Sequence, residues 1–85
     1  MSLHWGDALI NGYNFEWIEK DENDRYYQCR GEVYYDDEHD EMPEPGLWNA
    51  ALKLANGIRS DGYAADACYS EKGWVEVYVE GKIVQ

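Results

Sequence analysis

The carboxylates are the side chains in this sequence that could take part in the widest range of chemistry, and most of them lie in its first half. Residues 36–44 read DDEHDEMPE, which places six acids and one histidine within nine positions. Such a run can bind a hard cation, supply paired acids for catalysis, or contact a basic surface. These three chemistries need different surroundings, and the rest of the sequence discriminates between them.

A calcium site is not indicated. Asp36, Glu38 and Asp40 alternate as the first ligands of an EF-hand loop do, but that loop also needs Gly at its sixth position and Glu at its twelfth. Those two positions hold Glu41 and Leu47. The nearby histidine has no cysteine or second histidine beside it, which is a poor zinc signal. The sequence therefore predicts no metal and no cofactor.

Catalysis is not indicated either. His4 lies near the N-terminus and His39 lies in the acidic run. Cys29 and Cys68 lack CxxC spacing and lie in apolar stretches, where a free cysteine behaves as a small hydrophobe. Crowded, exposed carboxylates are solvated, so their pKa values are not driven apart as acid–base catalysis requires. We expect a non-enzymatic protein; an enzyme would need a pocket where His39 or Cys29 meets a carboxylate.

The charge is distributed unevenly. Residues 1–45 hold 13 acids and 3 bases and residues 46–85 hold 5 and 4, so the first half carries −10 of the formal −11. Such a field repels nucleic acid and anionic membranes and attracts basic proteins. The N-terminus shows no basic segment followed by an apolar run, so we expect no signal peptide, and no apolar run reaches the roughly 18–20 residues of a membrane span. We expect a cytoplasmic protein whose partner is a basic, nucleic-acid-binding protein or complex, with no direct binding of nucleic acid or membrane.

The elements that position these acids are expected to form one α+β domain over residues 1–85. Like charges and two prolines predict an exposed, unpaired loop at 36–46. Leu47, Ala51, Leu54 and Ile58 recur at helical spacing, and Pro45 suits a first turn. The predicted order is ββαββ, a small antiparallel sheet with one helix packed across a face. The strands are expected at 8–20, 25–35, 63–70 and 74–80, and the helix from Pro45 or Gly46 to about Ser60.

Alternation along these strands assigns their faces. Val75, Val77 and Val79 are expected to point inward, with Trp74 and Tyr78 pointing outward. The acids continue beyond the loop onto both early strands, where aromatic residues are interleaved on the solvent side. We expect a contact surface for a basic groove; the alternative is a loop whose charges are only solvated. The predicted contact residues are Asp36, Asp37, Glu38, Asp40, Glu41, Glu44, Glu16, Glu19, Glu22, Asp24, Glu32, Tyr26 and Tyr34.

A chain of this size, acidity and predicted element order resembles the small phage-encoded inhibitors of bacterial defence, among them anti-CRISPR and antirestriction proteins that mimic nucleic acid. The acidic run at 36–44 carries the resemblance, together with Glu16, Glu19, Glu22 and Asp24. The resemblance is one of class and assigns no role to any single residue. It implies an inhibitor that occupies a nucleic-acid-binding surface of its partner in the host cytoplasm.

A second hypothesis belongs to a different class. The nearly neutral second half contains Trp48, Trp74 and Tyr78, and exposed aromatic residues mark binding patches or dimer faces. The chain could then be a structural or assembly subunit that forms a homo-oligomer through these three residues. The sequence leaves open whether the protein is a monomer or a homodimer.

Overall fold

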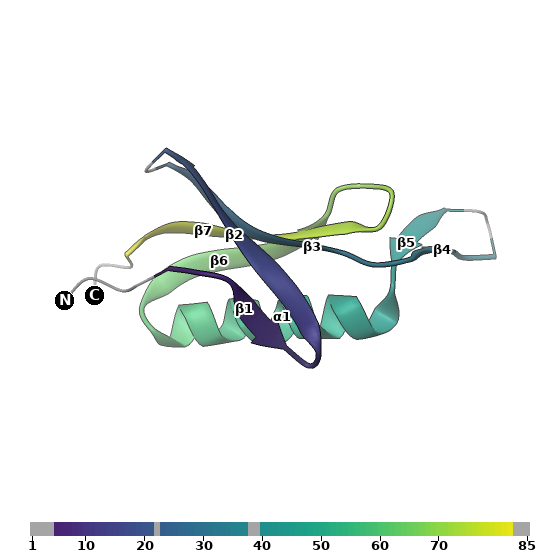
Figure 1. Ribbon diagram of the computed structural model, residues 1–85, viewed down its shortest axis with the longest axis horizontal. Helices are drawn as coiled ribbons and strands as arrows, with labels where there is room; N and C mark the ends of the chain where they lie inside the picture. Colours follow the sequence, from purple (N-terminus) through teal and green to yellow (C-terminus); the bar gives the residue numbers. More distant parts are fainter. Residues whose placement is uncertain (1–4, 22, 38–39, 83–85) are drawn as a thin grey trace.

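The chain forms a mostly β structure with one helix among its described residues. A computed structural model describes residues 5–21, 23–37 and 40–82 (Figure 1). In chain order the elements are β1 (Ala8–Ile10), β2 (Tyr13–Asp21), β3 (Asp24–Arg30), β4 (Val33–Tyr35), β5 (Glu41–Pro43), α1 (Pro45–Ser60), β6 (Tyr63–Tyr69) and β7 (Trp74–Lys82).

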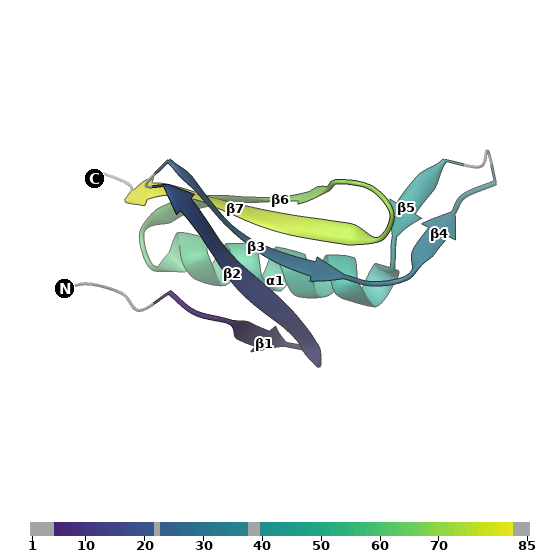
Figure 2. The same ribbon diagram turned by 45° about the horizontal axis from the view of Figure 1, so that its top comes forward.

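Five of the strands form one antiparallel sheet in the order β1-β2-β3-β7-β6, and β4 and β5 form a separate two-stranded sheet. The helix lies across one face of the larger sheet, and the β4–β5 hairpin projects past the N-terminal end of the helix (Figures 1 and 2). We call this hairpin, residues 33–43, the arm. The molecule is elongated, with extents of 46 × 23 × 23 Å.

The predicted α+β order ββαββ is wrong, in part because residues 8–20 form two strands. Asn11 and Gly12 have φ values of 52° and 86°. Positive φ at two consecutive residues is what a type I′ hairpin turn requires, and Asn-Gly is its commonest sequence. The chain therefore reverses between β1 and β2, with Ile10 paired to Tyr13. Apolar residues stand on both sides of this turn, and they favoured one continuous strand.

The predicted strand at 25–35 is also divided, at Gly31. The Gly31 N–H donates a hydrogen bond of 2.9 Å to the Gly73 carbonyl. A Cβ at Gly31 would lie 2.6 Å from Glu44 Oε2 and 2.9 Å from Leu47 Cδ2, so the chain passes close to the start of the helix here. β3 ends one residue earlier, and the chain leaves the large sheet to begin the arm.

The predicted unpaired loop at 36–46 contains a strand. β5 pairs with β4, and Val33 stands opposite Pro43. Proline is tolerated here because each strand of a two-stranded sheet has one side without a ladder partner. Pro45 opens the helix as predicted, and the helix ends at Ser60, also as predicted.

The core lies between α1 and the large sheet. Phe15, Leu47, Val75 and Val77 are its largest fully buried side chains. Burying a side chain of this kind contributes about 1.5–3 kcal/mol. Val79 is buried as well, so the predicted inward face of the last strand is confirmed. Small residues of the helix, Ala50, Ala51 and Ala55, let it lie close to the sheet.

Candidate binding surface

The side of the large sheet that faces away from the helix carries its own set of side chains. In β2, β3, β7 and β6 these residues alternate with the core residues, and the strand registers align them in rows. One row is Glu16, Gln28, Glu76 and Cys68, and the next is Ile18, Tyr26, Tyr78 and Asp66. We call this surface the open face: Glu16, Ile18, Lys20, Asp24, Tyr26, Gln28, Arg30, Asp66, Cys68, Trp74, Glu76, Tyr78 and Glu80.

The centre of the open face is aromatic. The rings of Tyr26 and Tyr78 lie 5.1 Å apart, and Lys20 Nζ lies 5.8 Å from the centre of the Tyr26 ring. Tyr26 is consequently only 8% exposed, whereas Tyr78 is 38% exposed. Tyr26 was predicted to be exposed to solvent, and that exposure is wrong because Tyr78, on the neighbouring strand β7, covers it.

Tyr78 is a neutral hydrogen-bond donor on this surface. Its hydroxyl donates to Glu76 Oε1 at 3.2 Å. Partial burial, followed by the adjacent Glu76 carboxylate, raises the pKa of Tyr78 to about 12. The phenol therefore keeps its proton throughout the neutral range. The outward position predicted for Tyr78 is confirmed.

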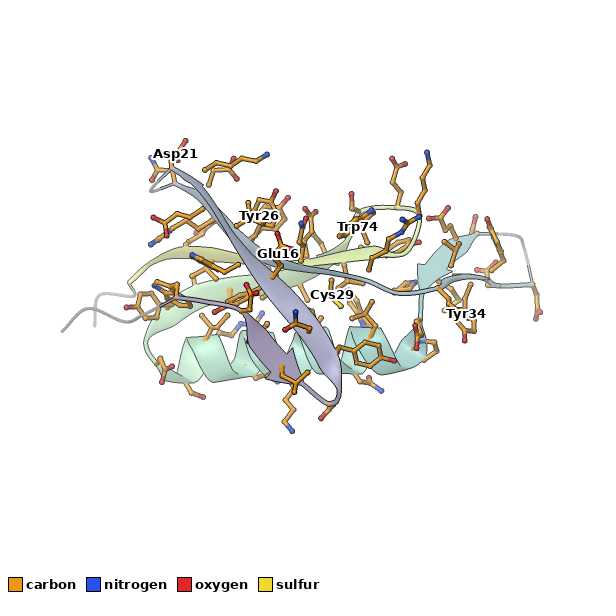
Figure 3. The ribbon with its side chains drawn as sticks, in the orientation of Figure 1. Glu16, Asp21, Tyr26, Cys29, Tyr34 and Trp74 are labelled. Atoms are coloured by element: carbon orange, nitrogen blue, oxygen red, sulfur yellow. The ribbon has the colours of Figure 1, made fainter. Side chains whose placement is uncertain are left out.

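Acids surround this aromatic centre. Five acids of the open face, Glu16, Asp24, Asp66, Glu76 and Glu80, outnumber its two bases, Lys20 and Arg30. Figure 3 shows Glu16, Tyr26 and Trp74 on the side of the sheet opposite the helix. Arg30 contacts neighbouring residues of the same protein. Its Cζ lies 5.8 Å from the centre of the Trp74 ring, and its Nε donates to the Lys72 carbonyl at 3.2 Å. Asp66 pairs with Arg59 at 3.1 Å, an exposed contact of small value.

Three of these five acids, Asp66, Glu76 and Glu80, come from residues 46–85, the half of the chain that is nearly neutral. Alternation in residues 74–80 puts Glu76 and Glu80 on the same side of the strand as Trp74 and Tyr78, which were predicted to point outward. What the alternation could not indicate is that β7 lies between β3 and β6. That strand order brings the late acids beside Glu16 and Asp24.

The arm carries a second group of acids. Asp36, Asp37 and Asp40 are exposed there. Two hydrogen bonds join the ends of the arm's turn: the Asp40 N–H donates to Asp36 Oδ1 at 2.8 Å, and the Asp36 N–H donates to the Asp40 carbonyl at 3.0 Å. Tyr34 is exposed on the same arm, as predicted (Figure 3). Two predicted contact residues, Glu22 and Glu38, lie outside the described residues, as does His39.

Glu44 was also predicted to be a contact residue, but its carboxylate is engaged within the protein. Tyr13 Oη donates to Glu44 Oε1 at 2.5 Å, and the Glu32 N–H donates to Oε2 at 3.2 Å. These hydrogen bonds, the tyrosine's first, hold the pKa of Glu44 below its ordinary value. The same contact raises the pKa of Tyr13 to about 12. Glu44 therefore fastens the base of the arm to β2.

Glu41 fastens the arm at a second point. Tyr69 Oη donates to Glu41 Oε1 at 2.5 Å, and the Lys72 N–H donates to the same oxygen. Both bonds lower the pKa of Glu41, the tyrosine's contribution being the larger. Tyr69 is itself held by the Gly73 N–H, which donates to its hydroxyl at 2.8 Å. Glu41 and Glu44, both predicted to be contact acids, thus attach the arm to the rest of the protein.

The remaining predicted acids do not all share one surface. Glu19 lies on the same face of β2 as Trp17 and accepts a 3.2 Å hydrogen bond from the Trp17 indole. Glu32 is exposed at the junction between β3 and the arm. The described acids of the prediction therefore fall into distinct places: Glu16 and Asp24 on the open face, Asp36, Asp37 and Asp40 on the arm, and Glu19 on the core side of β2.

The aromatic residues predicted as oligomer contacts are separated as well. Trp74 and Tyr78 belong to the open face, whereas Trp48 lies on the helix, on the other side of the sheet. The two cysteines also point to opposite faces, since Cys29 packs against the core and Cys68 stands on the open face beside Glu76. Burial raises the pKa of both thiols, which disfavours the reactive thiolate.

Within residues 5–21, 23–37 and 40–82, no group of three His, Cys, Asp or Glu side chains is placed to hold a metal ion. The helix among these residues is neither long nor apolar enough to cross a membrane. Comparison with protein families, with curated proteins and with solved structures finds no match for this chain.

Proposed function

We propose that this chain is a non-enzymatic binding protein whose acidic surface occupies a basic, nucleic-acid-binding surface of a partner protein. In biological terms it is an inhibitor of the phage anti-defence type that works in the host cytoplasm. The negative charge attracts the partner, and the aromatic residues supply contacts that exclude water.

The open face is the observation that carries this proposal. Specific interfaces combine a dehydrated apolar centre with a polar rim, and tyrosine and tryptophan are enriched in them. The open face has this composition, with Ile18, Tyr26 and Tyr78 in the middle and acids from four strands around them. With five acids against two bases, the complementary surface is a basic one.

The spacing of the acids supports a partner that normally binds nucleic acid. Side chains on the same face of a strand recur about every 6.6 Å, and neighbouring strands lie about 4.8 Å apart. Phosphates of one DNA strand follow each other at about 3.4 Å along the axis. Glu16 and Glu76 are two strands apart in one row of the open face, with Gln28 between them. These two carboxylates are therefore about 9.6 Å apart, close to three such phosphate steps, and can face arginine and lysine side chains that otherwise bind phosphates.

Capture from a bacterial lysate tests the proposal. The immobilised chain is incubated with nuclease-treated lysate at low salt, and the bound proteins are released by duplex DNA in one arm and by salt in the other. We expect a basic, nucleic-acid-binding protein that duplex DNA displaces, because the two would compete for one surface. Retention of no such protein, or retention that excess DNA leaves unchanged, contradicts the proposal.

A further inference from the structure

A groove of about 400 Å³ lies between the arm and the body of the molecule. Its walls come from three elements that are distant in sequence: β5, the first turns of α1, and the end of β6. The lining residues are Glu41, Met42, Pro43, Pro45, Trp48, Asn49 and Tyr69. The groove is on the helix side of the sheet and is separate from the open face.

The hydrogen bonds that Glu41 and Glu44 accept, which we call the tethers, hold the walls of this groove in place. Glu41 accepts hydrogen bonds from Tyr69 and from the Lys72 N–H, which join the arm to β6 and to the β6–β7 turn. Glu44 accepts from Tyr13, which fixes the chain just before the helix. A groove whose walls are fixed before binding loses little conformational entropy when a ligand enters.

The chemistry of the walls indicates the occupant. Most of the lining side chains are apolar or aromatic, the one charged member is Glu41, and none is basic. Asp36, Asp37 and Asp40 are exposed on the same arm that forms one wall. An apolar side chain gains free energy by leaving water for such a groove, at about 25 cal/mol per Å². Lysine or arginine beside that side chain would face the acids of the arm.

We propose that the groove binds a bulky apolar side chain from a basic peptide segment, with lysine or arginine on either side of it. This goes beyond the proposed function, because it assigns an anchoring site on a different surface. It also assigns two roles to the acidic arm. Fastened by Glu41 and Glu44, the arm forms one wall of the groove and presents negative charge beside it.

Two synthetic peptides test this assignment directly. The first has one leucine between two pairs of lysines, and the control has glycine in place of leucine, so that both carry the same charge. Titration into the ¹⁵N-labelled full chain is followed by NMR at the Trp48 indole N–H. We expect about tenfold tighter binding of the leucine peptide, as partial burial of one such side chain implies. Equal affinity for both peptides overturns the proposal.

A matched pair of variants locates the site. Met42, 41% exposed, forms part of the groove wall, whereas Leu52, 39% exposed, lies on the helix outside the groove. Met42→Lys places a cation in the groove and should abolish the preference for leucine. Leu52→Lys adds the same charge elsewhere and should preserve that preference. Similar behaviour of the two variants contradicts the assignment.

A third variant separates this inference from the proposed function. Glu16→Gln together with Glu76→Gln removes two charges from the open face and touches no lining residue of the groove. We expect this variant to keep the full preference for the leucine peptide. If the preference disappears, the peptide binds on the open face and the groove is not its site. If it persists while the unmodified chain captures no basic, nucleic-acid-binding protein from the lysate, the groove assignment stands and the proposed function falls.

Discussion

Glu41, in the arm, and Glu44, just after it, are both held by hydrogen bonds from other parts of the chain. Each accepts a short hydrogen bond from a tyrosine and a second bond from a backbone N–H. Hydrogen bonds to the charged form favour that form, so the pKa of each carboxyl lies below its ordinary value. The sequence shows six acids in nine positions, but it does not distinguish Glu41 and Glu44, which bind within the protein, from Asp37 and Asp40, which are exposed.

These contacts predict how the arm responds to pH. A carboxyl whose pKa is lower in the folded than in the unfolded protein stabilises the fold above the unfolded pKa, about 4.3 for glutamate. That contribution is lost as the pH falls through the folded pKa. We therefore expect the arm's attachment to be constant from neutral pH to about pH 5 and to weaken below about pH 4.

Two tyrosine variants identify the cause. Tyr13→Phe should return the pKa of Glu44 toward its ordinary value and leave Glu41 unchanged, and Tyr69→Phe should do the reverse. Carboxyl-detected NMR over pH 2–7 measures both values in each variant. Movement of both pKa values in one variant, or of neither, would show that the phenol groups are not responsible.

The direction of a side chain was predictable where buried and exposed residues alternate along a strand without interruption. Val75, Val77 and Val79 were correctly placed inward because one face of β7 packs on the helix and the other does not. The same reasoning assigned Tyr26 to the correct face but wrongly expected it to be exposed. Alternation specifies the face of a side chain, whereas its exposure depends on neighbours such as Tyr78 that belong to another strand.

At the level of elements, the helix was predictable and the strand divisions were not. Pro45 and the spacing of the apolar residues set the helix bounds correctly. The alternation of side chains in residues 25–35 does not reveal that the strand is divided at Gly31. The glycine occupies an inward position where an apolar residue would stand, so the alternation continues through it. Its cause is tertiary: the Gly31 N–H bonds to Gly73, and Glu44 and Leu47 occupy the space where a side chain would be. The turn at Asn11-Gly12, in contrast, has the commonest sequence of a type I′ turn and was predictable from it.

Two glycines give opposite predictions for stability. Gly73 has a φ of 87°, and an added Cβ would lie 2.2 Å from the Gly31 carbonyl oxygen. Gly73→Ala should therefore cost more than about 2 kcal/mol of unfolding free energy. Gly57 lies in the helix with nothing within 4 Å of an added Cβ. Gly57→Ala should raise stability by about 0.5–1 kcal/mol through backbone entropy.

Thermal unfolding followed by circular dichroism measures both effects. For a domain of this size, 1 kcal/mol corresponds to about 4–8 °C in Tm. We expect a fall of at least about 8 °C for Gly73→Ala and a rise of a few degrees for Gly57→Ala. A Gly73→Ala variant as stable as the parent would show that β3 and the β6–β7 turn are not held as close as the Gly31–Gly73 bond requires.

The exposed acids of the arm provide a third prediction. Asp37→Asn with Asp40→Asn removes two charges and leaves the tethers at Glu41 and Glu44 intact. We expect slower association with the captured partner and a Tm that is unchanged or slightly higher, since like charges repel in the free protein. Stopped-flow association kinetics and thermal unfolding test the two halves of this statement. An unchanged association rate at low salt would show that the charges of the arm do not speed the association of the two proteins.

At the scale of the whole molecule, the distribution of charge along the chain differs from its distribution in space. The sequence places −10 of the −11 in residues 1–45. Folding places β7 between β3 and β6 and thereby adds Glu76 and Glu80 to the acids of β2 and β3. Sequence reasoning found the acidity and favoured a basic partner, but the surface that presents the acids around an aromatic centre depends on strand order. Strand order is a property of the fold that the hydrophobic pattern does not encode.

The most direct test of the open face compares two variants of equal charge. Glu16→Gln with Glu76→Gln removes two acids from the open face, and Asp61→Asn with Glu71→Gln removes two exposed acids outside it. Each variant changes the formal charge from −11 to −9. Calorimetry measures the affinity of both for the captured partner at low salt. We predict that the open-face variant loses at least about tenfold in affinity, while the matched variant stays within about twofold of the parent. Equal losses in the two variants would contradict the account, because net charge alone would then explain the binding.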